Sequence, residues 1–197
     1  MPCRVTRVSA WAWPDTVLFT PARLQGVFVI DLERREDDRG YFARTFCEAE
    51  FAAAGLETRF VQANSAGTRR RGTVRGLHYQ RSPHEEVKVI RCTRGEIYDV
   101  LVDLRPESST FGQWQGFEID AVEGRMIYVP RGFAHGYQAL ADDVEVFYLV
   151  SHPYTPGAES GLHFGDPAFG IDWPLPVTEI SDKDRAWPPF RQRPEPV

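Results

Sequence analysis

Gly72-Thr-Val-Arg-Gly-Leu-His-Tyr-Gln80 places a cation, an imidazole and a phenol on one short segment that alternates like a β-strand. Successive side chains of a strand point to opposite faces. One face then carries Arg75, Leu77 and Tyr79, and the other carries Val74, Gly76, His78 and Gln80. The segment therefore predicts a base and a cation flanking one pocket.

A second segment, Val129-Pro-Arg-Gly-Phe-Ala-His-Gly-Tyr137, sets another histidine, His135, between small residues. Small residues let a ligand or another stretch of backbone approach closely. We expect the two histidine strands to face one cavity.

Short strand-like runs separated by turns fill most of the remaining chain. They are Phe60–Asn64, Val74–Gln80, Val87–Cys92, Glu96–Asp103, Gln113–Ile119, Arg125–Val129, Gly136–Leu140 and Val144–Val150. Val27–Arg34 and Tyr41–Phe46 flank a charged turn and predict a hairpin, while Cys47–Gly55 and Asp182–Ala186 read as short helices. Together these runs predict a mostly β protein, a jelly-roll sandwich with few short helices.

Length and composition indicate one domain. A chain of 197 residues with 42% hydrophobic content is long enough for one well-buried core and short for two. We expect an N-terminal extension over residues 1–25, the packed domain over 26–190 and a tail over 191–197.

Charge and hydropathy exclude several partners. The net charge of −5 and the lack of a dense Lys/Arg block argue against nucleic acid, although local arginines still suit small anions. No apolar run approaches the roughly 18 to 20 residues that cross a bilayer, and the first 20 residues lack the pattern of a signal peptide. We expect a soluble, cytoplasmic protein.

The ligand-forming residues do not predict a metal. Cys3, Cys47 and Cys92 are odd in number and form no CxxC pattern, so neither a disulfide framework nor a thiolate zinc site is expected. The five histidines include no His-x-His pair, which fits a metal-binding barrel poorly.

The segments suggest acid–base chemistry. A histidine base needs a carboxylate that orients it, and the sequence leaves Asp99, Asp103 and Asp184 open as candidates. Lys88 would stabilise an oxyanion if it points inward, and Tyr148 would donate a proton from the face opposite His78.

The order of these motifs resembles the dTDP-4-dehydrorhamnose 3,5-epimerase family, from about Gly26 to Pro189. The matching motifs are Asp38-Arg-Gly-Tyr-Phe42, Val61-Gln-Ala-Asn64, Gly72–Gln80, Lys88, Gly95-Glu96, Val102-Asp-Leu-Arg105, Thr110-Phe-Gly112, Pro130–Gly136, Tyr148 and Asp166-Pro167. The resemblance implies a cupin-type jelly roll that acts on nucleotide-linked 4-keto-6-deoxyhexoses.

The resemblance also implies a catalytic set. His78 would remove the proton next to the 4-keto group with Asp184 as its orienting carboxylate, and Lys88 would stabilise the enolate. Tyr148 would return the proton from the opposite face and invert C5, and the same pair would act at C3 without a cofactor.

The implied substrate contacts are more widely spread. Arg39 and Arg75 would bind the pyrophosphate and His135 the sugar, while the nucleotide would be placed by Phe42, Gln62, Asn64, Tyr154 and Glu159. Near the nucleotide base, the family often has an acidic residue at the position where this chain has Arg44. This change would alter which nucleotide base the protein prefers. A homodimer with exchange of an N-terminal strand is implied, in which Arg39 and Phe42 act in trans.

Other readings of the same residues stay open. A single-centre epimerase or an epimerase of a sugar on another nucleotide keeps the chemistry and changes the substrate. A metal-dependent cupin enzyme would depend on a bound metal, and a non-catalytic sugar-binding cupin would not exchange protons.

Overall fold

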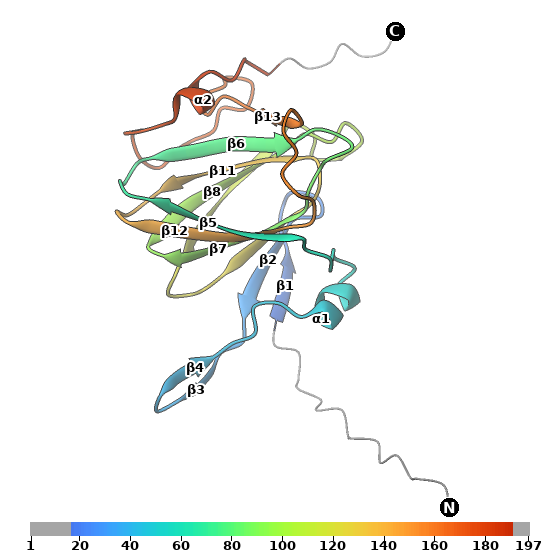
Figure 1. Ribbon diagram of the computed structural model, residues 1–197, viewed down its shortest axis with the longest axis vertical. Helices are drawn as coiled ribbons and strands as arrows, with labels where there is room; N and C mark the ends of the chain where they lie inside the picture. The colour runs from blue at the N-terminus through green and yellow to red at the C-terminus, as the bar shows by residue number, and fades with distance from the viewer. Residues whose placement is uncertain (1–16, 191–197) are drawn as a thin grey trace, which may run out of the picture.

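The computed structural model describes residues 17–190, which form two antiparallel sheets packed face to face (Figure 1). The six-stranded sheet contains, in spatial order, β1 (Val17–Pro21), β2 (Phe28–Leu32), β10 (Met126–Val129), β7 (Lys88–Arg94), β12 (Val144–Val150) and β5 (Gln62–Thr68). The five-stranded sheet contains β13 (Glu159–Gly161), β6 (Val74–Gln80), β11 (Phe133–Ala139), β8 (Glu96–Asp103) and β9 (Trp114–Asp120). The predicted mostly β jelly roll is confirmed.

The main core lies between the two sheets. Ile90 of β7 and Ile127 of β10 belong to the same buried cluster as Leu101 of β8 and Ile119 of β9, and each is at most 1% exposed. Burial of one such side chain contributes roughly 1.5–3 kcal/mol. The alternation of β8 points Ile97 and Leu101 into this core, and the same period turns Asp99 and Asp103 inward.

Two smaller clusters cover the outer faces of the sheets. Phe51 of α1 (Glu48–Ala53) is fully buried against the six-stranded sheet, where Phe19 and Phe60 meet it edge-on. The C-terminal segment, which includes α2 (Asp182–Arg185), covers the five-stranded sheet. Both predicted helices are therefore present, each slightly shorter than predicted.

The N-terminal boundary of the domain lies earlier than predicted. β1 pairs with β2 from Val17–Leu32 to Pro21–Phe28, and Leu24 is fully buried. Residues 17–25 thus belong to the packed domain. The sequence pattern did not reveal this strand, because it is short, ends in proline and shows little periodicity. Residues 1–16, the rest of the predicted extension, and the predicted tail 191–197 lie outside the described residues.

The predicted hairpin between residues 27–34 and 41–46 was wrong. β2 pairs with β1 and β10, whereas β3 (Arg35–Asp37) and β4 (Gly40–Phe42) form a ribbon of their own that projects from the body (Figure 1). Alternation identifies a strand but not its partner, and the two hydrogen-bonding edges of β2 are occupied by β1 and β10. β5 and β11 also differ from their predicted ranges, since β5 extends to Thr68 and β11 begins at Phe133.

An extra residue in β6 changes which side chains share a face. Opposite β11, His78 pairs with His135 and Arg75 pairs with Tyr137, so three steps along β6 match two along β11. This is the signature of a β-bulge, at which alternation is interrupted. Gly76 permits it, because a Cβ there would lie 2.6 Å from Cα of Gly136 and its φ is +116°. The predicted placement of Arg75 with Leu77 was therefore wrong.

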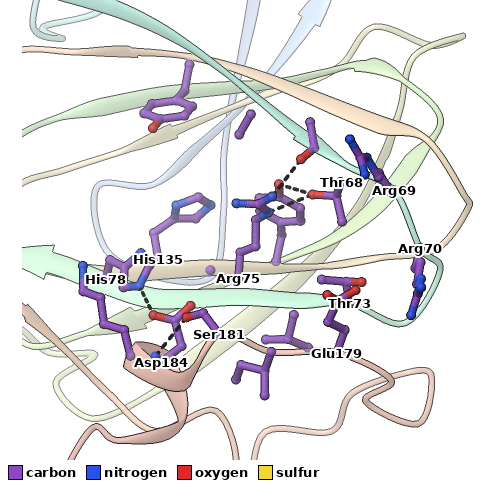
Figure 2. Close-up of a pocket in the computed structure, with 18 of the residues that line it drawn as sticks. Thr68, Arg69, Arg70, Thr73, Arg75, His78, His135, Glu179, Ser181 and Asp184 are labelled. Carbon is purple, nitrogen blue, oxygen red and sulfur yellow. Dashed lines mark hydrogen bonds and ion pairs between the residues drawn. The ribbon is translucent and has the colours of Figure 1, made fainter.

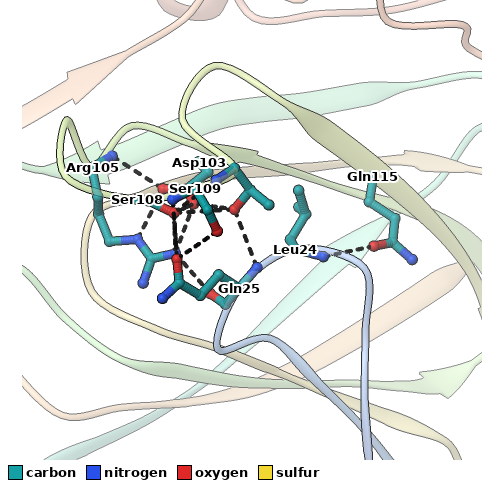
Figure 3. Close-up of polar contacts among 8 residues, drawn as sticks. Leu24, Gln25, Asp103, Arg105, Ser108, Ser109 and Gln115 are labelled. Atoms are coloured by element: carbon teal, nitrogen blue, oxygen red, sulfur yellow. Dashed lines mark hydrogen bonds and ion pairs between the residues drawn. The ribbon is translucent and has the colours of Figure 1, made fainter.

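A polar network fastens the β8–β9 loop to the turn before β2 (Figure 3). Asp103 is fully buried and accepts hydrogen bonds from Arg105, Ser108 and Thr110. Arg105 also donates to the carbonyl of Gln25 at 2.7 Å. Burial alone would raise the pKa of Asp103, but these donors outweigh it and the pKa is lowered. Asp103 is thus a structural carboxylate, and it does not contact His78.

Candidate active site

A polar cavity of about 650 Å³ opens between the two sheets. β5, β7 and β12 contribute to one wall, β6 and β11 to the other, and the segment around α2 completes the lining (Figure 2). Six of the predicted site residues line it: His78, Arg75, His135, Lys88, Tyr148 and Asp184. The expectation that two histidine strands face one cavity is confirmed.

His78 forms a close pair with Asp184 (Figure 2). Its Nε2 lies 2.5 Å from Oδ1 of Asp184, while Oδ2 accepts a hydrogen bond from the backbone of Gly76 at 3.1 Å. A carboxylate accepts, so the neutral imidazole carries its proton on Nε2 and leaves Nδ1 as the basic atom. The structure thus joins His78 to one of its three candidate carboxylates.

Asp184 is positioned by the first turn of α2. Ser181 caps this helix and accepts a hydrogen bond from the backbone N–H of Asp184 at 3.1 Å. Asp184 is 4% exposed, and burial would raise its pKa, but the bonds from His78, Gly76 and Ser181 outweigh burial and lower it. Asp184 therefore stays ionised and is able to stabilise a protonated His78.

His135 has a carboxylate partner of its own. Its Nε2 lies 2.6 Å from Oδ1 of Asp99, which is fully buried, and Oδ2 of Asp99 has no hydrogen-bond partner among residues 17–190. Since His135 and His78 are directly opposed on β11 and β6, the two imidazoles lie side by side on one wall. Asp99, the second candidate carboxylate, therefore serves the second histidine.

Tyr148 and Lys88 reach the cavity from the opposite sheet. Burial first of all raises the pKa of Tyr148, Arg75 lowers it and Glu86 raises it, so the phenol holds its proton at neutral pH. Lys88 is only 9% exposed and its ammonium lies 3.2 Å from a carboxylate oxygen of Glu86. Lys88 is thus an inward-facing lysine, the orientation that oxyanion stabilisation requires.

Three arginines line the cavity (Figure 2). Arg75 donates to Thr68 at 2.9 Å and to the carbonyl of Gly67 at 2.7 Å, and Arg69 and Arg70 also line the cavity. Guanidinium groups suit phosphate because they offer paired, charged hydrogen bonds. The bulge in β6 is what brings Arg75 to the same wall as His78.

Four further predicted residues lie outside the cavity lining. Gln62 accepts from the backbone of Tyr154, whose hydroxyl donates to Glu159, and Glu159 pairs with Lys183 at 2.6 Å. Lys183 does line the cavity, so this chain of contacts ends at its edge. Asn64 lies opposite Tyr148 in the β5–β12 ladder, which points both side chains to the same face.

The three remaining predicted residues lie apart from the cavity of their own chain. Arg39 and Phe42 are on the projecting β3–β4 ribbon, where they are exposed. Arg44 pairs with Glu50 of α1 at 2.5 Å, so its charge is already compensated within the chain.

Several residues of the site were not predicted. Thr68 anchors Arg75, Ser181 caps the helix that carries Asp184, and Glu86 pairs with Lys88. The Ser181-x-x-Asp184 spacing is a helix-start signal that would have pointed to the cap. Nothing in the local pattern marks Thr68, because its partner Arg75 lies on another strand. Glu86 lies only two positions before Lys88, but that spacing does not show that the pair is buried.

Residues 17–190 contain neither a cluster of metal-binding side chains nor a helix of membrane-spanning length. There, no group of three or more His, Cys, Asp or Glu side chains is arranged to hold a metal ion. The described helices are all too short to cross a membrane. Cys92 is buried, and burial raises the pKa of its thiol to about 11.

The fold and the site together define a cupin-type jelly roll with an acid–base cavity. A histidine–aspartate pair on one sheet faces a protonated phenol and an ammonium group on the other. Such a constellation suits proton removal and return at a carbon acid.

Comparisons with known proteins identify the family. The family model for dTDP-4-dehydrorhamnose 3,5-epimerase matches residues 21–192. The dTDP-4-dehydrorhamnose 3,5-epimerase of Methanothermobacter thermautotrophicus is 45% identical over 179 residues, 89% of this chain and 96% of the relative. This chain belongs to the dTDP-4-dehydrorhamnose 3,5-epimerase family, as its motifs predicted.

Two other relatives extend the comparison. The crystal structure of the Bacillus anthracis dTDP-4-dehydrorhamnose 3,5-epimerase with TDP and PPi bound has a TM-score of 0.86 at 35% identity, covering 88% of this chain and 99% of that one. A dTDP-4-dehydrorhamnose 3-epimerase of Streptomyces niveus is 39% identical over 84% of this chain and 80% of its own length.

Proposed function

We propose that this protein is a cofactor-independent isomerase that epimerises C3 and C5 of dTDP-4-dehydro-6-deoxy-D-glucose to give dTDP-4-dehydro-L-rhamnose. One observation carries the proposal: the His78–Asp184 pair and the phenol of Tyr148 enter one cavity from opposite sheets. Inversion at carbon requires a base on one face and an acid on the other, and this arrangement supplies both.

The reaction begins at His78. The ketone at C4 acidifies the protons on C3 and C5, and Nδ1 of His78 takes one of them while Asp184 stabilises the imidazolium that forms. Lys88 stabilises the enolate oxygen from the other wall. Acid and base groups of this kind contribute about 10²- to 10⁴-fold each, so charge stabilisation at the enolate supplies much of the remainder.

Tyr148 completes the inversion. Its raised pKa keeps the phenol protonated at neutral pH, so it is able to return a proton to the carbon from the face opposite His78. The same pair acts on C5 and, after the sugar shifts, on C3. His135, held by Asp99 beside His78, contacts the sugar.

The diphosphate lies toward the arginines of the cavity. Arg75 has a preset orientation because Thr68 and Gly67 hold its guanidinium. We assign the nucleotide to the side of the cavity near Gln62, Asn64, Tyr154 and Glu159, where the exposed Tyr154 ring is available for stacking. Arg44 is neutralised by Glu50, which weakens the case that it alters the base preference.

A homodimer completes the site. Arg39 and Phe42 are exposed on a ribbon that projects from the body, where they serve a neighbouring subunit better than their own (Figure 1). Within residues 17–190, β1 forms one edge of the six-stranded sheet, which is the position from which it would extend a partner's sheet. The dimer therefore exchanges its N-terminal strand, and each ribbon binds pyrophosphate and nucleotide in the partner's cavity.

Hybrid dimers test the action in trans. Arg39→Ala and His78→Asn are each expected to be inactive, but mixing the two by unfolding and refolding together restores activity in the hybrid, where one cavity receives both intact residues. Equal inactivity of the mixture, with hybrids verified by mass spectrometry, would show that Arg39 acts within its own chain.

Hydrogen exchange tests the function itself. The protein is incubated with dTDP-4-keto-6-deoxyglucose in heavy water, and deuterium at C3 and C5 is followed by NMR, with CDP, UDP and GDP analogues in parallel. Exchange and inversion at both carbons support the proposal. Exchange at C3 alone would place the protein with the 3-epimerase of Streptomyces niveus, and a chelator-sensitive reaction would favour a metal-dependent enzyme. The cytoplasmic location stays a prediction.

A further inference from the structure

A buried carboxylate lies behind the lysine of the site. The side chain of Glu86 is 8% exposed and is not part of the cavity lining, yet its Oε1 lies 3.2 Å from Nζ of Lys88. Its Oε2 accepts a hydrogen bond from Gln80 at 2.6 Å. Both carboxylate oxygens are thus held, and one of them is held by a residue of the proposed reaction.

Gln80 fixes the position of Glu86. Gln80 is itself buried, and its amide oxygen accepts from the backbone of Thr155 at 2.7 Å. Its amide nitrogen also contacts the carbonyls of His84 and Pro153. The carboxylate therefore sits in a frame built from β6 and two loops, and it cannot move away from Lys88 without breaking that frame.

The charge of Glu86 also reaches Tyr148. Burial raises the pKa of this phenol, Arg75 lowers it and Glu86 raises it again. The titratable or charged groups that line the cavity together with Tyr148 are Lys88 on β7, Arg75 and His78 on β6, His135 and Tyr137 on β11, Arg69 and Arg70 after β5, and Glu179, Lys183 and Asp184 in and before α2. Of these groups Arg75 favours the phenolate, and the anion of Glu86, which lies behind Lys88, opposes it.

We propose that Glu86 is a positioning residue of the epimerase reaction, which anchors the Lys88 ammonium at the cavity wall and places a buried negative charge behind the wall that Lys88 shares with Tyr148. This inference rests on the proposed function, because it assigns Glu86 a role only through Lys88 and Tyr148. Burial is the main reason that the phenol keeps its proton, and Glu86 adds to it while its pairing with Lys88 leaves no net charge from that ammonium.

The test compares Glu86→Gln with Glu85→Gln. Glu85 is the adjacent glutamate, and it makes no hydrogen bond or ion pair with any residue of the range 17–190. Both variants remove one negative charge, but only Glu86→Gln removes it from the buried pair. We expect the alkaline limb of C5 inversion to move down by roughly 0.5 to 1 pH unit in Glu86→Gln and to stay unchanged in Glu85→Gln.

A spectroscopic readout separates this inference from the proposed function. The difference in ultraviolet absorbance between each protein and its Tyr148→Phe counterpart follows the phenol directly, with or without turnover. The phenol should ionise at lower pH in Glu86→Gln than in the native protein. Glu86→Asp keeps the negative charge and should show the native titration of Tyr148. It is also the variant to use if Glu86→Gln does not fold. An unchanged Tyr148 titration in Glu86→Gln, or one that shifts equally in Glu85→Gln, would overturn the proposal.

Discussion

The Asp103 network and the Asp184–His78 pair both bury a carboxylate against a basic partner, but they use it differently. Asp103 is fully buried and surrounded by the donors of Arg105, Ser108 and Thr110, which leave it no free direction. Asp184 fixes one nitrogen of His78 and leaves the other facing a cavity. Each carboxylate has a lowered pKa despite its burial.

The comparison teaches that burial and pairing do not by themselves make a carboxylate a catalytic candidate. Asp184 differs from Asp103 in that its partner, His78, lines a cavity and makes no hydrogen bond through Nδ1 within residues 17–190. Asp103 closes its network on the chain itself and holds a loop against the turn at Gln25 (Figure 3). Variants at the two positions should therefore separate activity from stability.

The largest effect is expected at His78. His78→Asn should lower deuterium exchange at C3 and C5 by about 10³-fold or more, since the base is lost while the shape is kept. Binding of dTDP, measured by calorimetry, should persist because the nucleotide contacts are elsewhere. Normal turnover in this variant would remove His78 from the mechanism.

Asp184→Asn should have the next largest effect. The amide keeps an acceptor for Gly76 but no longer stabilises the imidazolium, so kcat should fall by about 10²-fold or more. Thermal unfolding serves as the control, and it should change less than in Asp103→Asn. A variant with native kcat would show that Asp184 only shapes the loop.

Asp103→Asn should lower stability and leave activity unchanged, which is the opposite of the result expected for Asp184→Asn. Loss of the charge leaves the partly buried Arg105 without its counter-ion, and removal of one partner of a buried pair costs at most about 3–5 kcal/mol. Urea unfolding should show this loss in the free energy of unfolding, while the exchange rate per folded molecule stays native. If activity falls more than stability, the two regions are coupled.

The smallest effect concerns acid stability. The pKa of Asp103 is lower in the folded protein than in the unfolded chain. Its contribution to the free energy of unfolding is therefore complete above the unfolded-state pKa of about 3.9, and it is lost as the pH falls through the folded-state pKa. Below about pH 4, the native protein should therefore lose stability more steeply than Asp103→Asn, by about 1.4 kcal/mol per unit of pKa shift. Parallel unfolding curves from pH 7 to 3 would contradict this assignment.

Much of the fold and part of the site follow from local patterns. The strand-like runs predict the jelly roll, and the motif order predicts the family as well as the inclusion of His78, Lys88, Tyr148 and Asp184 in one cavity. The predicted pairing of residues 27–34 with residues 41–46 was wrong, because alternation does not show which strand a given strand pairs with. The N-terminal boundary was late for a similar reason, since β1 is recognisable only from its ladder with β2.

The sequence by itself determined the chemistry available: a histidine, a lysine, a phenol and several carboxylates placed on strands of a β sandwich. Only the tertiary structure decided which of them meet. Asp184 reaches His78 from 106 positions away, and Arg75 joins His78 on one wall because the close approach of Gly76 to Gly136 permits a bulge. Strand periodicity is a local property of the backbone, whereas partner choice and bulges depend on contacts between segments that are distant in the chain.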